Sequence, residues 1–195
     1  MSSLRRIPLT ETEARIVEAA IGIFIRYGAK KTTMADIAEA AGVSRQTVYA
    51  SFGDKDGIIV ACIRHVSEAS LAAIRARLGS CGTLGERLDV YFGETVVKSF
   101  EMLQEAGDPE DLISGHNQAG KAAIREAHAR QAALIAELLE PYADTIARSG
   151  QTPAQLARFV VTVAMGLKYG AGDRSALDEL LQSLRHSVIA LTDSG

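Results

Sequence analysis

The chain has 195 residues, of which 47% are hydrophobic and 23% are charged. This composition is typical of a folded protein with a buried core and excludes a disordered chain. The formal net charge is −3, which argues against a surface that is basic on every side. The longest apolar run, 159–167, is far shorter than the ~20 residues of a membrane helix, and no signal-peptide stretch is visible. We therefore expect a cytoplasmic protein that has no membrane partner.

Residue usage predicts an all-α fold. Alternation of β-branched residues, the pattern of strands, is almost absent, and Gly-, Ser- or Pro-bearing breaks divide the chain into about nine helices. Cys62 and Cys81 follow no metal-ligand spacing. We expect two reduced thiols and no cofactor.

The first predicted helix spans 11–27. Thr10 and Glu13 have the spacing of a capping box, which satisfies the free amides of a helix start. Gly28 stands where a helix ends easily.

Two short helices follow, over 34–41 and 44–52. Thr33 and Ser44 are their expected N-caps, and the residues 42–44 form a tight turn between them. On a helical wheel of the second one, Val48 and Phe52 share the inward side. The opposite arc of the helix has Arg45 at its edge and is formed by Gln46, Thr47, Tyr49 and Ala50.

Two helices joined by a tight turn, with long hydrogen-bonding side chains outward, are typical of the helix-turn-helix that reads DNA in the major groove. Arg45 can bond guanine and Gln46 adenine, each through two hydrogen bonds, and the methyl group of Thr47 can contact thymine. Thr33, Tyr49 and Lys55 are placed to bind phosphates of double-stranded DNA. Residues 1–62 hold eight basic and seven acidic residues, so a basic face remains possible on an acidic protein.

A long fourth helix is expected over 55–78. The later helices are expected at 84–105, 109–114, 120–149, 153–169 and 174–192. We assign residues 1–53 to a helix-turn-helix DNA-binding domain and residues 54–195 to a helical ligand-sensing and dimerisation domain.

The segment "TTMADIAEAAGVSRQTVYASFGDKDGIIVA", 32–61, resembles the DNA-binding segment of the TetR family of transcriptional regulators. The resemblance is dense over 10–62, and the rest of the chain agrees only in length and helical character. It implies phosphate contacts for Thr33, Tyr49 and Lys55. It implies base contacts for Arg45, Gln46 and Thr47, whereas Ala50 is smaller than the residue often found at its position.

The last two predicted helices carry apolar residues at helical spacing. Such a seam suits helix–helix packing, and in TetR relatives two helices from each chain form a dimer. We therefore expect a homodimer, and the alternative is a seam that packs inside one chain. The predicted interface residues are Leu156, Val160, Val163, Leu177, Leu181, Leu184, Val188 and Leu191.

The resemblance also implies a small-molecule effector bound between these regions. A mostly apolar pocket with a few polar groups is expected, and for each candidate residue taken singly the favoured alternative is a plain core or surface role. The candidate pocket residues are Tyr91, Thr95, Phe100, His116, Asn117, Phe159 and Tyr169.

We thus predict a ligand-responsive, sequence-specific regulator. The prediction is a repressor released from a palindromic operator by an apolar or amphipathic effector, with the helix from Lys55 as the lever. The alternative is a helical interaction protein that does not read DNA sequence. An enzyme is not expected, because the near P-loop "GHNQAGKA" at 115–122 has Ala122 in place of the magnesium-binding hydroxyl and no strand before it. The four histidines form no paired metal-binding or catalytic motif.

Overall fold

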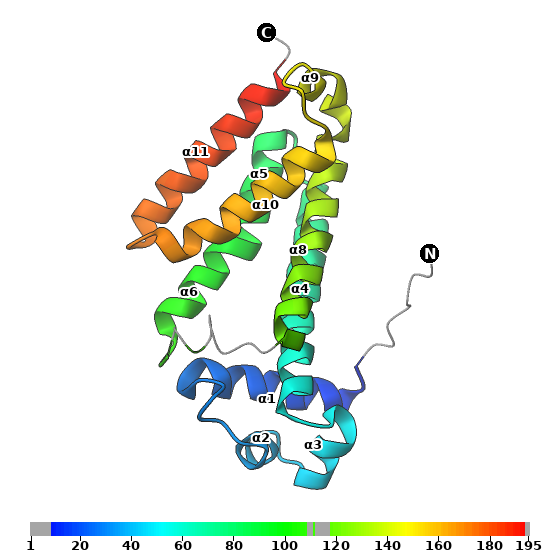
Figure 1. The fold of residues 1–195 in the computed structure, drawn as a ribbon, viewed down its shortest axis with the longest axis vertical. Helices are drawn as coiled ribbons and strands as arrows, with labels where there is room; N and C mark the ends of the chain where they lie inside the picture. The colour runs from blue at the N-terminus through cyan, green and yellow to red at the C-terminus, as the bar shows by residue number, and fades with distance from the viewer. Residues whose placement is uncertain (1–8, 109–110, 112–117, 194–195) are drawn as a thin grey trace. The chain divides into compact units, whose positions relative to one another are not determined.

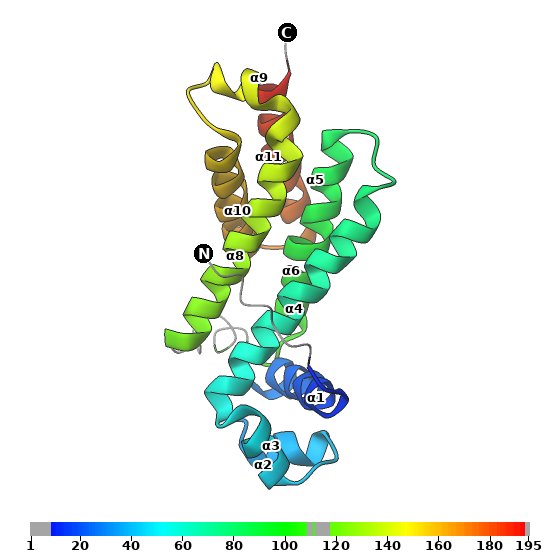
Figure 2. The same ribbon diagram turned by 90° about the vertical axis from the view of Figure 1, so that its right-hand side faces the viewer.

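The computed structural model describes residues 9–108, 111 and 118–193, and within these ranges the regular elements are helices. The chain divides into two compact units (Figure 1, Figure 2). The first comprises Met1–His65 and Glu105–Lys121, and the second Val66–Gln104 and Ala122–Gly195. The functional boundary between residues 53 and 54 stays a prediction.

The first unit contains α1 (Glu11–Tyr27), α2 (Met34–Ala40), α3 (Arg45–Phe52) and the start of α4 (Lys55–Leu78). A capping box at Thr10 starts α1, as expected from the sequence, and the expected N-cap Thr33 starts α2 through a capping box with Asp36. The core takes side chains from all four helices: Ile16, Val17, Ala20, Phe24, Ile37, Ala38, Val48, Ile58, Ile59 and Cys62.

Helix α4 is the one described helix that is long and apolar enough to cross a membrane by length and composition alone. Its apolar residues have another explanation, because two different cores use them. Ile58 and Ile59 belong to the core of the first unit, and Leu71 and Ile74 belong to that of the second. Core packing therefore accounts for part of the hydropathy of this helix.

The second unit continues from α4 with α5 (Leu84–Phe92), a π-helical turn (Gly93–Val97) and α6 (Lys98–Glu105). These three run without a break, which confirms the helix expected over 84–105. The helix expected over 109–114 lies almost wholly outside the described residues.

Helix α8 (Gln118–Leu139) is shorter than the expected helix 120–149. A 3-10 turn (Glu140–Tyr142) separates it from α9 (Ala143–Ala147). Pro141 lies in this turn, and proline can neither donate the next helical hydrogen bond nor fit the preceding turn.

The chain ends with α10 (Pro153–Gly170) and α11 (Arg174–Thr192), which pack against each other. Their buried residues join the core of the second unit, together with residues of α4, α5, the π-helical turn, α6, α8 and α9. This core includes the fully buried side chains Tyr91, Leu88, Ile135, Leu139 and Leu156.

Candidate nucleic-acid interface

The turn between α2 and α3 is fixed by backbone and side-chain hydrogen bonds. Gly42 has a φ of 63°, a conformation that glycine adopts without steric cost. The amide of Val43 donates to the carbonyl of Ala38 at 3.0 Å. The Oγ atom of Ser44 accepts from the amide of Thr47 at 3.0 Å, so α3 begins where the sequence predicts.

Helix α3 is held by one side and exposed on the other. Val48 is fully buried and Phe52 packs partly buried against the same core. Arg45 and Gln46 are exposed, and the Tyr49 side chain is 51% exposed. The polar face expected from the helical wheel is therefore present and open to a ligand.

The three residues predicted to read bases differ in which of their groups are available to contact DNA. The side chains of Arg45 and Gln46 extend from the exposed face near the start of α3. The Thr47 hydroxyl lies 2.8 Å from that of Ser44, so its polar atom already takes part in the helix cap. Thr47 can offer its methyl group to a base without breaking that contact.

Two of the three residues predicted to bind phosphates already make hydrogen bonds within the protein. The hydroxyl of Thr33 donates to the Asp36 carboxylate at 2.8 Å. The Thr33 backbone and side-chain hydrogen bonds hold the pKa of Asp36 below its usual range. Lys55 donates from Nζ to the carbonyls of Ala29 at 2.8 Å and Thr32 at 3.2 Å. Since an ammonium group has three donors, one donor of Lys55 remains for a phosphate.

The chain after α6 adds contacts to the α1–α2 turn that sequence reasoning missed. The amide of Gly107 donates to the carbonyl of Ile25 at 3.0 Å. The Asp111 carboxylate accepts from the amide of Lys30 at 2.7 Å, and its other oxygen is 3.4 Å from Lys30 Nζ. These contacts stabilise the turn that leads into Thr33.

The predicted effector residues fall into three groups. Tyr91, Thr95 and Phe100 are buried in the second unit. Phe159 and Tyr169 are more than half exposed, at 55% and 54%, so the structure does not bring their rings into that core. His116 and Asn117 lie outside the described residues. Membership of an effector site stays a prediction for all of them.

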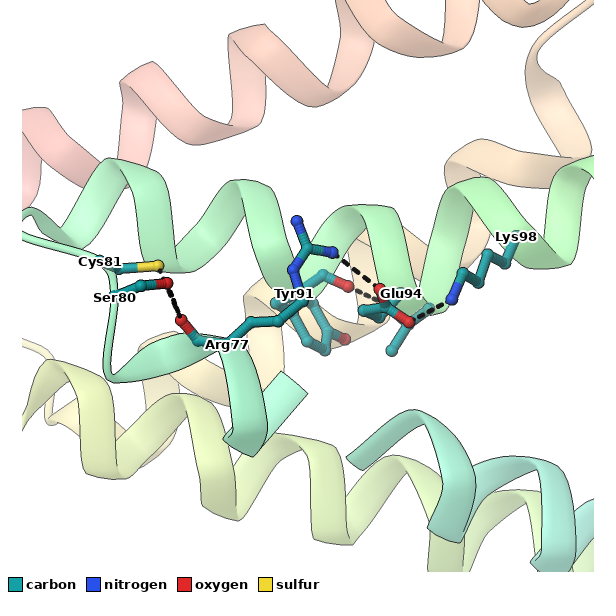
Figure 3. A network of polar contacts seen from close by, with 7 residues as sticks. Arg77, Ser80, Cys81, Tyr91, Glu94 and Lys98 are labelled. Carbon is teal, nitrogen blue, oxygen red and sulfur yellow. Dashed lines mark hydrogen bonds and ion pairs between the residues drawn. The ribbon is translucent and has the colours of Figure 1, made fainter. Parts of the chain in front are cut away.

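Two of the buried residues join a polar network around the π-helical turn (Figure 3). The Tyr91 hydroxyl donates to Oε1 of Gln131 at 3.3 Å, and the Thr95 hydroxyl donates to the carbonyl of Tyr91 at 2.7 Å. Burial raises the pKa of Tyr91 above its ordinary value, so this phenol stays neutral.

A buried carboxylate lies beside them. The Glu94 side chain is 7% exposed and contacts Lys98 one turn later and Arg77 from α4, whose Nη1 is 2.8 Å from Oε1 (Figure 3). The hydrogen bonds from Lys98 and Arg77 hold the pKa of Glu94 below its usual range. The run of apolar residues before Glu94 gives no sign in the sequence that this glutamate contacts Lys98 and Arg77.

A partly buried cation of this unit, Lys168, lies on α10. Burial lowers the pKa of Lys168 to about 8, and its Nζ stands 4.9 Å from the ring centre of Tyr169. Burial and the positive charge of Lys168 lower the pKa of His128 on α8. These two side chains therefore shed protons more readily than exposed ones.

The residues predicted for the dimer interface lie mainly in the core of their own chain. The fully or nearly fully buried ones are Leu156, Val160, Leu177, Leu181, Leu184 and Val188, and Val163 and Leu191 pack partly buried against them. This placement matches the alternative of a seam within one chain. It leaves a different face of α11 exposed, formed by Leu180, Ser183, Ser187 and Ala190.

Comparison with known proteins agrees with this geometry. The family model "Bacterial regulatory proteins, tetR family" matches residues 16–62, which span α2, α3 and parts of α1 and α4. Two curated relatives, both from Pseudomonas putida, are the probable HTH-type transcriptional regulator ArpR, 29% identical, and the HTH-type transcriptional regulator TtgR, 28% identical. Each match covers 80% of this chain and 75% of the relative.

A solved structure shows the same fold over nearly the whole chain. The crystal structure of a TetR-family transcriptional regulator from Rhodococcus sp. superposes with a TM-score of 0.73 at 18% identity, covering 95% of this chain and 100% of that one. The exposed polar face of α3, the family match and the relatives lead to one conclusion. The chain belongs to the TetR family and is a transcriptional regulator with a helix-turn-helix DNA-binding domain.

Proposed function

We propose that this regulator is a cytoplasmic homodimeric repressor that leaves a palindromic operator when a small apolar or amphipathic molecule binds the second unit. The observation that carries the DNA part is the two-sided character of α3. Its Val48 is fixed in the core while Arg45 and Gln46 are exposed. A reading helix needs such a rigid inner side, because base contacts depend on a fixed register.

Within this proposal, Arg45 and Gln46 read bases through paired hydrogen bonds, and Thr47 contributes its methyl group. Tyr49, which is 51% exposed, binds a phosphate through its hydroxyl. Lys55 holds the carbonyls of Ala29 and Thr32 and uses its remaining donor on a phosphate. Thr33 stands at the start of α2, where backbone amides favour an anion.

The dimer is proposed to form through the exposed faces of α10 and α11. On α11 the exposed residues Leu180, Ser183, Ser187 and Ala190 recur at intervals of three and four, as in a helix-packing seam. They carry no charge, so a second copy can cover them without desolvating an ion. A two-fold dimer places two reading helices roughly 34–36 Å apart, one turn of DNA.

The effector response is proposed to act through α4. This helix contributes Ile58 to the core of the first unit and Ile74 to that of the second, so a change in one core acts on a helix that the other core also holds. Linkage requires that a molecule which weakens operator binding is itself bound more weakly in the presence of operator.

The test is a titration of the protein against DNA from upstream of its own gene, with random DNA beside it. Fluorescence anisotropy at two salt concentrations measures both affinity and its ionic part. We expect selective binding that weakens steeply with salt, because phosphate contacts release counterions. If selection from a random DNA pool also yields no preferred sequence, the chain is a helical interaction protein instead.

A further inference from the structure

Two buried donors of the Arg130 side chain have no acceptor within the described part of the chain. Arg130 lies on α8, and its Nη1 is 3.3 Å from Oε1 of Glu68 on α4. Its Nε and Nη2 are shielded from solvent and make no hydrogen bond. Burying such charged donors without partners costs free energy, so native proteins rarely keep them without a reason.

A third unpaired donor lies on α4, next to Glu68 in the chain. Ser67 precedes Glu68 in the chain, is 6% exposed, and its hydroxyl also makes no hydrogen bond to any described residue. A serine inside a helix commonly bonds the carbonyl one turn earlier, and Ser67 does not. Both helices that meet at the Arg130–Glu68 contact therefore carry buried donors that are free.

The geometry of these donors indicates the shape of the missing group. Nε and Nη2 lie on one edge of the planar guanidinium, where their N–H bonds run parallel and match the two oxygens of a carboxylate. The positions one turn further along each helix are apolar: Leu71 after Ser67 and Leu134 after Arg130, both in the core of the second unit. Along both helices the polar residues are thus followed, one turn later, by an apolar core residue.

We propose that Arg130 and Ser67 bind the carboxylate of an amphipathic effector. Nε and Nη2 of Arg130 donate to its two oxygens, the Ser67 hydroxyl donates to one of them, and the apolar body of the effector lies towards Leu71 and Leu134. Glu68 orients the guanidinium through Nη1. This inference rests on the proposed effector response of the second unit and adds the chemical class of the effector.

The experiment measures binding to the full chain by calorimetry and by the shift in Tm, using octanoate, decanoate and 2-naphthoate as probes. Decanamide is the uncharged control of matched length. We expect at least one carboxylate to bind and raise Tm, and decanamide to bind about tenfold or more weakly, as the loss of a charge-assisted hydrogen-bond pair requires. Failure of all three carboxylates, or equal binding of decanoate and decanamide, overturns the proposal.

Variants locate the site. Arg130→Met and Ser67→Ala are expected to weaken carboxylate binding, with the larger loss at Arg130. Arg125→Met, which changes an exposed arginine on the same helix, is expected to leave binding unchanged. Loss of binding in Lys168→Met with full binding in Arg130→Met would assign the anion to Lys168 and overturn the proposal.

Two further measurements separate a binding role from a structural one and from the proposed function. Without ligand, Arg130→Met is expected to lower Tm little, because two of its buried donors are unpaired and its contact with Glu68 involves a carboxylate that is 52% exposed; a large fall would show a structural role. Release of operator DNA is measured with the same carboxylates. Binding that is lost in Arg130→Met but never releases DNA would keep this site and contradict the proposed effector response.

Discussion

The Asp111 carboxylate accepts a hydrogen bond from the backbone amide of Lys30 at 2.7 Å, although the two residues are 81 positions apart in the chain. Asp111 is 3% exposed, so water does not satisfy this carboxylate. Gly28 makes the approach possible. A Cβ atom there would stand 2.7 Å from Oδ2 of Asp111, and its φ of 82° is one that other residues rarely adopt. The turn before α2 is therefore built together with a segment that follows α6.

Asp111→Ala is expected to destabilise the first unit by ~1–3 kcal/mol, because the Lys30 amide loses its acceptor inside the protein. Thermal unfolding measures the loss, and hydrogen exchange should show faster exchange of the amides in the α1–α2 turn. Glu18→Ala, at an exposed position of α1, is the control and should change neither. Unchanged exchange in the turn of Asp111→Ala would show that the contact does not stabilise it.

Gln46→Ala is expected to weaken binding to the preferred DNA site by ~1–3 kcal/mol and to relax preference at one base position, while random DNA is bound as before. Tyr49→Phe is the matched comparison, since loss of a phosphate contact should lower affinity on every sequence alike. Anisotropy titrations against the preferred site and its single-base variants measure both effects. A uniform loss across all sequences for Gln46→Ala would contradict base reading.

The elements of the DNA-binding unit could be predicted because their signals are local. The capping boxes at Thr10 and Thr33, the start of α3 at Ser44 and the turn at Gly42 each depend on residues within one helical turn. Short-range hydrogen bonds of this kind leave a direct pattern in the sequence. The contact between Asp111 and Lys30 leaves none, since nothing near either residue specifies the other.

The spacing of apolar residues predicted that α10 and α11 pack through these residues. It did not predict whether they pack within their own chain or against a second copy. Leu177 and Leu184 recur at seam positions whether they meet their own chain or a second copy, and the structure buries them in their own core. The donors of Arg130 and Ser67 were missed for a related reason. A sequence shows which groups can form hydrogen bonds, and only the folded chain shows which are left without a partner.

The placement of this seam gives a prediction about the dimer. Leu180→Glu changes a side chain that is 40% exposed and is expected to yield folded monomers with weak DNA binding. Leu184→Glu puts a charge where the side chain is 7% exposed and is expected to unfold the second unit, since an unpaired buried charge is costly. Light scattering gives the mass, and circular dichroism gives the helix content. Dimers that persist in Leu180→Glu would place the interface on another face.

The Glu94 network predicts a contribution to stability that depends on pH. Contacts with Lys98 and Arg77 hold the pKa of Glu94 in the folded chain below the ordinary value of 4.5. A carboxyl whose pKa is lowered by folding stabilises the fold at pH values above its unfolded pKa, and this stabilisation is lost as the pH falls through the folded pKa. Glu94→Gln removes the charge while keeping the shape of the side chain.

Glu94→Gln is therefore expected to be less stable than the parent protein at pH 7, with a difference that shrinks as the pH falls below 4.5. Denaturant unfolding at a series of pH values measures both proteins, and Glu140→Gln, at an exposed position, serves as the control. A difference that stays constant down to the lowest pH would mean that Glu94 acts by packing alone. A difference that vanishes in acid would show that its charge, held between α4 and the π-helical turn, stabilises the second unit.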